Sequence, residues 1–488
     1  MKEKIDRAFP AFVVILAVWL FGNMLRRYAV GASFWLDEAF IVYDVMNVPL
    51  SGMFSALPVC QQFPRLYLFI IKIIGMIFGY GSYSMRILPL LFSIASMAVW
   101  FKVILKSSDL LSRRIFFMLF FTGAVMFLQY STEIKQYSAD LFWCGLLTFW
   151  YVNILKSGDE GPLWRYVLLG FPVLLSYTYL PVATAILIIE FSPFGSKVVS
   201  RRSLSVLALT LTVLLILLYR IDLVHICGGI KEFWEGAFIG RESIYQFISS
   251  SGERWYDYLG GWFFTEWYSI PLFGTKATSV LIFLTVLTSL IGIAVLVRES
   301  RSGERHQRGL AMLAILVSVE LYVAGILRLY PFGALRMNLF ALPFAALFVS
   351  AGLAFLVKRA WTSVAAVIVV LPLLNILVAF PFSQIIQNLN TIDWDSPMVK
   401  DKPLLVSDCS YYQVNTYSKL KERAGIFHYA DSKLGDALAS VKPPFFYLLT
   451  HNCGELQRNT LNELTGKFRT RVMTSGSVVG FLYVYDTM

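Results

Sequence analysis

Long apolar runs, separated by short polar segments, follow one another along most of this sequence. A helix of about 20 apolar residues crosses the roughly 30 Å hydrocarbon core of a bilayer. Of the 488 residues, 57% are hydrophobic and only 15% are charged, whereas an average soluble protein carries roughly 25% charged residues. These features exclude a water-soluble, disordered, coiled-coil or collagen-like chain, and they predict a polytopic α-helical membrane protein.

Eleven of these runs are candidates for membrane-spanning helices. They cover residues 9–24, 85–105, 115–130, 138–155, 165–180, 182–195, 203–219, 277–297, 309–327, 338–357 and 361–381. The first run follows three basic residues, as the apolar region of a signal peptide does, but no small-residue cleavage site comes after it. We therefore expect this run to remain as the first of about 11 transmembrane helices.

The positions of lysine and arginine predict the orientation of these helices. If the N-terminus is cytoplasmic, every inner loop is basic, at residues 102–114, 156–165, 197–202, 298–308 and 358–359. Such a bias is typical of cytoplasmic loops, and it accounts for the net charge of +11 without a nucleic-acid partner. We expect a multi-pass protein of the cell (inner) membrane, surrounded by membrane lipids, with a cytoplasmic N-terminus.

The apolar segment Leu66–Gly79 does not fit this pattern, because its 14 residues are short for a membrane span. If it were counted as a span, all later basic clusters would lie outside the cytoplasm. We therefore expect an interfacial or re-entrant juxtamembrane helix along the outer face.

The composition changes at about residue 384, where the apolar runs end. Residues 402–406, 445–449 and 478–485 have strand patterns, and Tyr411–Arg423 and Glu455–Lys467 have helical spacing. We predict a transmembrane domain over residues 1–383 and a small C-terminal α/β domain outside the cytoplasm over residues 384–488. Cys409 and Cys453 both fall in this second domain and could pair in an oxidising compartment.

Two of the predicted outer loops carry acidic residues close to the end of a span. Asp37 and Glu38 follow Trp35 in the first outer loop, and Glu133 lies two residues before Lys135 in the second. One interpretation is a pair of ordinary interfacial loops with solvated acids and an exposed ion pair. The other is a shared pocket, because both loops lie on the same predicted face and acids at such positions are candidates for catalysis or cation binding.

Four stretches together resemble a known family. Residues 35–39 (WLDEA) resemble the Asp-Glu signature of GT-C glycosyltransferases, in the branch of protein O-mannosyltransferases and lipid A aminoarabinose transferases. Residues 63–67 with Lys72 resemble a Pro-Pro-x-Tyr helix in which Phe63 replaces the first proline. Residues 130–137 resemble a Tyr-Ser-x-Glu-x-Arg-x-Tyr motif with Lys135 at the arginine position, and residues 330–333 with Arg336 resemble a late outer-loop segment.

The resemblance implies an enzyme that moves a sugar from a polyprenyl-phosphate donor to an acceptor outside the cytoplasm. The acceptor class stays open between glycolipid, polysaccharide and protein. Asp37 is the best candidate for the general base, and Glu38 or Glu133 would orient it. Either acid could instead hold a divalent metal cation together with Asp37, so Asp37 and Glu133 are also a candidate metal pair.

A lipid-phosphate leaving group needs fixed cations around it. The cationic candidates on the correct side are Lys135, Arg336, Arg65 and Lys72. Three tyrosines in the matching motifs are candidate substrate contacts: Tyr67, Tyr137 and Tyr330. The juxtamembrane helix would form one wall of a groove for the prenyl tail.

Two other functions compete with the enzyme. A transporter or flippase of lipid-linked sugars would place charges near the bilayer midplane and would often show internal repeats, which are not seen here. A non-catalytic membrane assembly protein would not depend on Asp37.

Three further residues are weaker site candidates: Glu190 and Glu320, in or near spans, and His225, in the large outer loop. The aromatic-rich loop 220–276 either anchors at the interface or covers the acceptor site.

Overall fold

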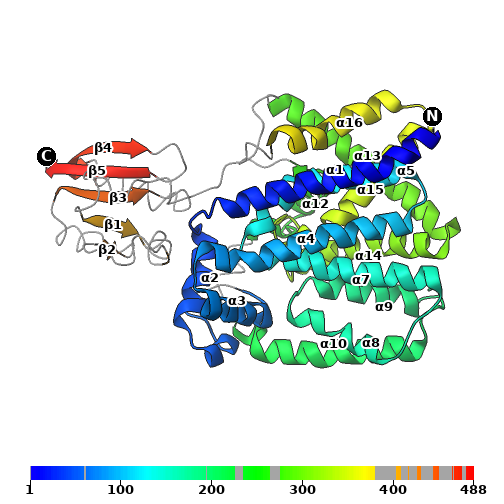
Figure 1. The fold of residues 1–488 in the computed structure, drawn as a ribbon, viewed down its shortest axis with the longest axis horizontal. Helices are drawn as coiled ribbons and strands as arrows, with labels where there is room; N and C mark the ends of the chain where they lie inside the picture. The colour runs from blue at the N-terminus through cyan, green and yellow to red at the C-terminus, as the bar shows by residue number, and fades with distance from the viewer. Residues whose placement is uncertain are drawn as a thin grey trace.

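The structure is a computed structural model. It describes residues 2–59, 62–193, 195–225, 235–263 and 275–379, and in the C-terminal part residues 403–407, 416, 426–429, 443–449, 464, 466–474 and 480–487. The first part is helical, and the second contributes a β-sheet that lies beyond one end of the helices (Figure 1).

Seven helices in the described part are long and apolar enough to cross a membrane. They are α1 (Lys2–Ala29), α4 (Ser82–Ser107), α7 (Tyr137–Ser157), α10 (Arg201–Ile221), α13 (Thr275–Ser302), α14 (Arg305–Ile326) and α15 (Leu342–Lys358). Helix α15 is the most deeply buried of these and packs against α13 and against α5 (Leu111–Thr122). The predicted polytopic helical membrane protein is confirmed.

An eighth candidate span is bent in the middle. Helix α5 and helix α6 (Val125–Gln129) meet at 50°, and together they pass the same length and composition test. Helix α5 ends at Thr122, and a Cβ atom on the following Gly123 would come within 2.6 Å of Pro372. The side-chain amide of Asn375 donates to the Gly123 carbonyl at 2.9 Å. This bend leads into the short 3-10 helix η2 (Tyr130–Thr132), which precedes Glu133.

The count of eleven full-length spans is not confirmed, because three segments are shorter. They are residues 164–174, comprising α8 (Trp164–Leu168) and η3 (Phe171–Leu174), then α9 (Tyr179–Phe191), and Thr362–Leu377, which includes α16 (Thr362–Leu374). The predicted helix 165–180 is interrupted beside Pro172, which has no backbone N–H to continue a helix. The turn between η3 and α9 reaches the loop before α3 (Arg65–Phe78), because the Tyr177 hydroxyl donates to the Phe63 carbonyl at 2.7 Å.

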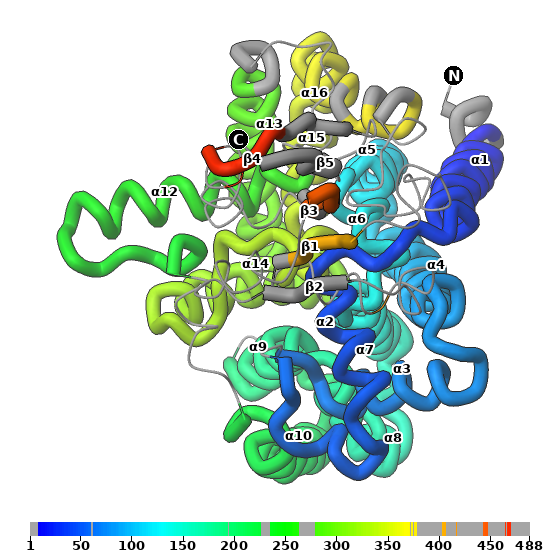
Figure 2. The backbone as a smooth tube through the Cα atoms, turned by 90° about the vertical axis from the view of Figure 1, so that its left-hand side faces the viewer, coloured from blue at the N-terminus to red at the C-terminus, as the bar shows by residue number. Residues whose placement is uncertain are grey.

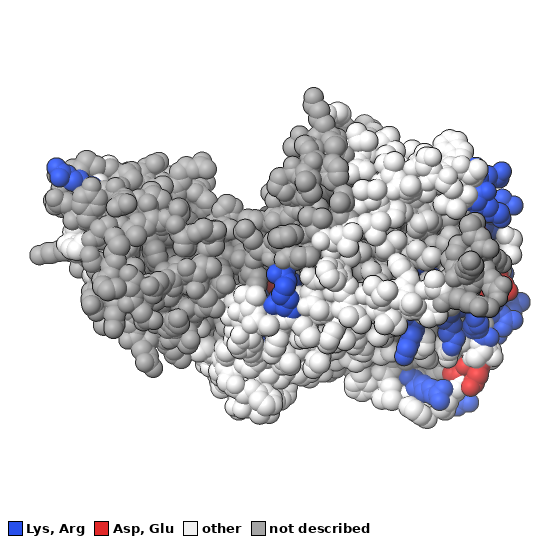
Figure 3. Space-filling view, turned by 45° about the horizontal axis from the view of Figure 1, so that its top comes forward, with Lys and Arg blue, Asp and Glu red and all other residues white. Residues whose placement is uncertain are grey.

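The two ends of the helical bundle differ. Helix α2 (Leu36–Asn47) and helix α3 lie at the end that faces the sheet, and we call this the site end; the N-terminus lies at the opposite end (Figure 1). Seen from the site end, helix α12 (Ile244–Gly260) extends to one side of the bundle (Figure 2). Lysine and arginine side chains gather at the opposite end (Figure 3), as the basic loops of the sequence predict.

The sheet has five strands in the order β2-β1-β3-β5-β4. Strands β1 (Leu404–Ser407), β3 (Phe445–Leu449) and β5 (Gly480–Thr487) match the three predicted strands, whereas β2 (Ile426–Tyr429) and β4 (Phe468–Thr474) were not predicted. Strand β1 pairs in parallel with β2 and β3, and β5 pairs antiparallel with β3 and β4. Most of the two predicted helices, and both Cys409 and Cys453, lie outside the described residues.

Candidate functional site

Three loops meet at the site end around the carboxylate of Asp37. Asp37 lies in the first turn of α2, and its Oδ2 atom accepts a hydrogen bond from Arg336 Nη1 at 3.1 Å. The ammonium of Lys135 lies 3.8 Å from the same oxygen. The Asp37 side chain is 19% exposed, so its carboxylate is partly accessible. These contacts confirm that the first and second acidic loops lie at the same end of the molecule.

Glu38 is fully buried and joins the loops to the bundle. Its carboxylate pairs with the guanidinium of Arg86 on α4, whose Nε donates to Oε1 at 3.0 Å. The same oxygen accepts the backbone N–H of Ile134 at 3.1 Å, and Oε2 accepts that of Trp35 at 3.4 Å. With both oxygens occupied, Glu38 suits the role of a positioning residue that places Asp37 beside the second loop better than a direct role in catalysis.

Glu133 is buried in the middle of this charged cluster. Its electrostatic neighbours are Glu38, Arg27, Asp37 and Arg336. Burial and the nearby carboxylate of Glu38 hold the pKa of Glu133 well above its usual range. Its Oε2 atom has no hydrogen-bond partner in the part of the chain that the structure describes. The raised pKa favours the protonated form of Glu133, which adds no negative charge beside Asp37.

Lys135 presents a desolvated cation to the site. Its side chain is 7% exposed, and its ammonium lies 4.9 Å above the ring of Phe63. Burial lowers the pKa of Lys135, and the nearby carboxylate of Asp37 opposes this effect. An anion that enters the site would therefore meet a cation that water does not screen.

The third loop is rigidly braced, which fixes the position of Arg336. The buried side-chain amide of Asn338 donates to the carbonyls of Pro331, Phe332 and Ala334 at 2.9 to 3.1 Å. The Tyr330 hydroxyl donates to the Met337 carbonyl at 2.8 Å. Tyr330 therefore supports the loop, and this contact does not leave its hydroxyl directed at a substrate.

Part of the aromatic loop 220–276 supports the same segment. The Phe332 ring lies 5.1 Å from Trp255 and 5.2 Å from Tyr258 on α12, measured between centroids. The hydroxyl of Tyr258 lies 2.7 Å from that of Ser318 on α14. These aromatic side chains thus pack as core beneath the Arg336 loop. Residues 226–234 and 264–274 of the large loop lie outside the described ranges.

Three other predicted site residues are occupied by structural contacts. Arg65 Nε donates to Asp222 Oδ1 at 3.2 Å, and both side chains are at most 2% exposed. Lys72 Nζ donates to the Val45 carbonyl at 2.6 Å. The buried Tyr67 hydroxyl lies 3.2 Å from the Ile134 carbonyl, to which it donates. These contacts join α3 to α10, to α2 and to the second loop, and they favour structural roles over the predicted phosphate and substrate contacts.

Tyr137, the remaining predicted contact residue, begins α7 beside the cluster. Its ring meets Tyr130 edge-on at a centroid distance of 5.1 Å, and it is 5% exposed. Its electrostatic neighbours include Arg336 and Asp37. Tyr137 therefore lies within the site and forms part of its wall.

Sequence reasoning missed two arginines that shape the site, Arg27 and Arg86. Arg27 lies in the last turn of α1, and its Nη2 donates to the Gln129 carbonyl at 3.5 Å. Arg86 lies in α4, near its start at the site end. The sequence did carry a signal for them. Arg26, Arg27 and Arg86 lie on the predicted outer side, whereas lysine and arginine are generally enriched on the cytoplasmic side.

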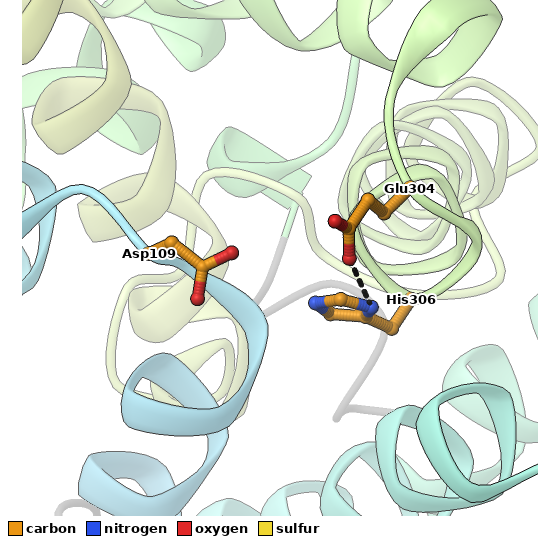
Figure 4. A group of neighbouring side chains, drawn as sticks. All are labelled: Asp109, Glu304 and His306. Atoms are coloured by element: carbon orange, nitrogen blue, oxygen red, sulfur yellow. Dashed lines mark ion pairs between the residues drawn. The ribbon is translucent and has the colours of Figure 1, made fainter.

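Asp37 and Glu133 do not suit a divalent metal. Two cationic side chains already lie close to Asp37, and Arg27 and Arg336 are neighbours of Glu133. Glu38, the third acid, is occupied by Arg86. Among the described residues, Asp109, Glu304 and His306 form a group of three acidic and histidine side chains (Figure 4). This group lies at the opposite end of the bundle (Figure 1).

The weaker candidates lie apart from Asp37. Glu190 accepts hydrogen bonds from the Tyr151 hydroxyl and from Ser196, both at 2.6 Å. Glu320 accepts from the Thr184 hydroxyl at 2.7 Å. His225 ends the short helix η4 (Leu223–His225). The hydrogen bonds of Glu190 and Glu320 do not involve Asp37 or Glu133.

An apolar groove of about 680 Å³ runs between α1, α5 and the end of α16. Its lining is almost entirely apolar and includes Leu16, Trp19 and Ile376, with Arg26 at the site end. Arg26 precedes Arg27, which is an electrostatic neighbour of Glu133. The groove therefore reaches the last turn of α1, which also carries Arg27, and it lies on a different side of the bundle from the wall that was predicted at α3.

No family model matches the sequence, and no curated protein matches it. Two solved structures of ArnT from Cupriavidus metallidurans are similar to the chain, each with a TM-score of 0.49. The one bound to undecaprenyl phosphate is 11% identical and covers 99% of this chain and 98% of that chain. The apo state is 12% identical, with 98% coverage of both chains.

The Archaeoglobus fulgidus oligosaccharyltransferase, solved in complex with Zn and sulfate, has a TM-score of 0.50 and is 12% identical. The similarity covers 96% of this chain and 72% of that chain. The protein therefore has a fold similar to that of this oligosaccharyltransferase, and the resemblance expected from the sequence motifs is confirmed at the level of the fold alone.

Proposed function

We propose that this chain is an integral membrane glycosyltransferase that transfers a sugar from a polyprenyl-phosphate donor to an acceptor outside the cytoplasm. The observation that carries the proposal is the half-buried carboxylate of Asp37, held between the cations of Arg336 and Lys135. A general base beside fixed cations is what displacement of a sugar from a phosphate requires. The acceptor is a hydroxyl-bearing glycolipid, polysaccharide or protein, and nucleic acid is not a partner.

In this mechanism Asp37 takes the proton of the acceptor hydroxyl as the acceptor oxygen attacks the anomeric carbon. The bond from that carbon to the phosphate oxygen breaks, and its electron pair stays on the polyprenyl phosphate. Attack opposite the leaving group inverts the anomeric configuration. The planar guanidinium of Arg336 donates hydrogen bonds to the phosphate, and the ammonium of Lys135 stabilises it as a point charge.

The resting ion pairs hold the Asp37 carboxylate beside the two cations that a donor phosphate would contact. A donor phosphate competes for Arg336 and Lys135, and this competition places the anomeric carbon close to Asp37. Burial and the carboxylate of Glu38 raise the pKa of the neighbouring Glu133, which favours its uncharged form.

The prenyl tail of the donor fits the apolar groove beside α1. The groove opens along the side of the bundle and ends near Arg26, so a lipid can enter from the surrounding leaflet. The apolar lining lets a prenyl tail stay in hydrocarbon-like surroundings while its phosphate reaches the end of the groove. The groove supports a lipid-borne donor more directly than a water-soluble one.

The arrangement in the membrane is part of the proposal. Residues 1–383 form the catalytic transmembrane domain, and residues 384–488 form a domain outside the cytoplasm on the side of the site. The gathering of basic residues at the opposite end supports a cytoplasmic N-terminus in the cell (inner) membrane (Figure 3). The clustering of the reactive charges at one end argues against a transporter of lipid-linked sugars.

Replacement of Asp37 by Asn tests the proposal in reconstituted vesicles supplied with polyprenyl-phosphate sugars. Loss of the base should reduce transfer by about 10²- to 10⁴-fold. Asp159→Asn, an exposed position at the opposite end, serves as the matched control and should keep full activity. Unchanged transfer by Asp37→Asn would show that Asp37 is not the base. If the unaltered chain transferred sugar from none of the donors tested, the assembly-protein alternative would be favoured.

A further inference from the structure

The opposite end of the bundle carries a cluster of metal-ligating side chains that the proposed transfer does not use. Asp109 lies in the turn between α4 and α5, Glu304 immediately precedes α14, and His306 is in its first turn. One potential ligand atom from each of the three residues lies within 4.8 Å of the others. Figure 4 shows the carboxylate of Asp109 and the imidazole of His306 directed toward one another across a short gap.

His306 provides a second, independent indication of a ligand. Its Nδ1 atom lies 3.5 Å from Glu304 Oε2, and the residue is 4% exposed. Its Nε2 atom is buried and has no hydrogen-bond partner in the described ranges. Buried ring nitrogens are normally satisfied, so an open one on the side of Asp109 indicates a missing partner.

We propose that Asp109, Glu304 and His306 bind a divalent transition-metal ion of the zinc type. Imidazole nitrogen and carboxylate oxygen bind Zn²⁺ at about 2.0 to 2.2 Å, which sets neighbouring ligands about 3.4 Å apart in a tetrahedron. Asp109 and Glu304 are 65% and 68% exposed, so their side chains can close the remaining distance around the ion. Water completes the fourth position. Mg²⁺ and Ca²⁺ fit less well because they prefer all-oxygen sites.

The ion would join two turns that are far apart in sequence. Near the same turns, Arg113 on α5 pairs with Glu299 on α13, with N–O distances of 2.8 and 2.5 Å. The metal would add a second connection between α4–α5 and α13–α14.

Two side chains already contact the Asp109 carboxylate. Arg114 lies 3.8 Å from Asp109 Oδ1, and Gln307 donates to Asp109 Oδ2 at 3.4 Å. The metal must compete with both, so the site should bind weakly enough to exchange with the surrounding solution.

Zinc binding to the full chain in detergent tests the proposal after removal of metal by a chelator. ZnCl₂ titrated against a competing chromophoric chelator should show about one ion per chain. The same ZnCl₂ should raise Tm by roughly 3 °C, because a ligand that binds only the folded state stabilises it. MgCl₂ at equal concentration should leave Tm unchanged.

Glu304→Gln and His306→Gln should each abolish the zinc-dependent rise in Tm and the bound ion. Glu304 is exposed, so the first variant folds even if the buried His306 variant does not. His225→Gln, a histidine at the site end, is the matched control and should bind zinc like the unaltered chain. Zinc binding that survives Glu304→Gln, or an equal effect of MgCl₂, would overturn the assignment.

Discussion

Arg336 Nη1 lies 3.1 Å from Asp37 Oδ2, although the two residues are 299 positions apart in the sequence. The contact joins the loop before α15 to the first turn of α2, so it requires both segments to be in their folded positions. It also pairs a candidate base with a candidate phosphate-binding cation. The proposed exchange of Arg336 from Asp37 to the donor phosphate predicts separate effects on donor binding and on fold stability.

Arg336→Lys should weaken donor binding more than folding. Lysine keeps the charge but loses the planar, two-pronged donor that suits a phosphate. We expect the KM for the polyprenyl-phosphate donor to rise about tenfold, which corresponds to roughly 1.4 kcal/mol. Donor-dependent initial rates in vesicles measure this change. Arg328→Lys is the control, because Arg328 pairs with the exposed acids Glu235 and Glu242. An unaltered donor KM in Arg336→Lys would contradict a phosphate contact.

Glu38→Gln should mainly lower the stability of the fold. The substitution leaves the buried guanidinium of Arg86 without its charged partner, and breaking such a pair costs about 3–5 kcal/mol. We expect a large fall in Tm in detergent. The double variant Glu38→Gln with Arg86→Met should recover part of the loss, because no buried charge remains unpaired. A Glu38→Gln variant that is fully stable but inactive would show instead that Glu38 takes part in the chemistry.

The sequence was sufficient to predict that Asp37 and Glu133 lie at one end of the molecule. The prediction rested on the basic loops, whose bias follows from the energetics of membrane insertion and not from contacts within the fold. The prediction of spans failed on the interrupted segment 164–174, because it rested on apolar composition and did not use Pro172, beside which the helix is interrupted. Strand β4 was missed because its alternating pattern directly follows a helical one.

The roles of individual charges were harder to predict. Arg65 and Lys72 are on the expected side, but side and motif position do not tell which partner a cation has. Asp222, the partner of Arg65, is 157 residues away, and the partner of Lys72 is a backbone carbonyl with no sequence signal. Arg336, unlike Arg65 and Lys72, lies next to Asp37, because the hydrogen bonds of Asn338 hold its loop in place. These hydrogen bonds also have no recognisable pattern in the sequence.

Lys72→Met should separate a structural lysine from a phosphate-binding one. Methionine keeps the length of the side chain but cannot donate to the Val45 carbonyl, so we expect a loss of about 2 kcal/mol in stability. The donor KM should stay within about twofold of the unaltered value. Lys135→Met is the comparison and should raise the donor KM about tenfold or more. If the two variants change the donor KM equally, Lys72 contacts the phosphate after all.

Glu133 should make the protein less stable as the pH rises. Burial and the charge of Glu38 raise its pKa in the folded state, so the folded protein binds a proton that the unfolded chain releases at about pH 4.3. Stability from this group is therefore greatest below the unfolded pKa and falls as the pH increases toward the folded pKa. Glu133→Gln removes the titration and keeps the shape. Thermal unfolding from pH 5 to pH 8 should show the variant gaining in Tm relative to the unaltered chain as the pH rises. Parallel pH profiles for the two proteins would show that Glu133 is ionised throughout this range, and that the site holds two neighbouring charged carboxylates.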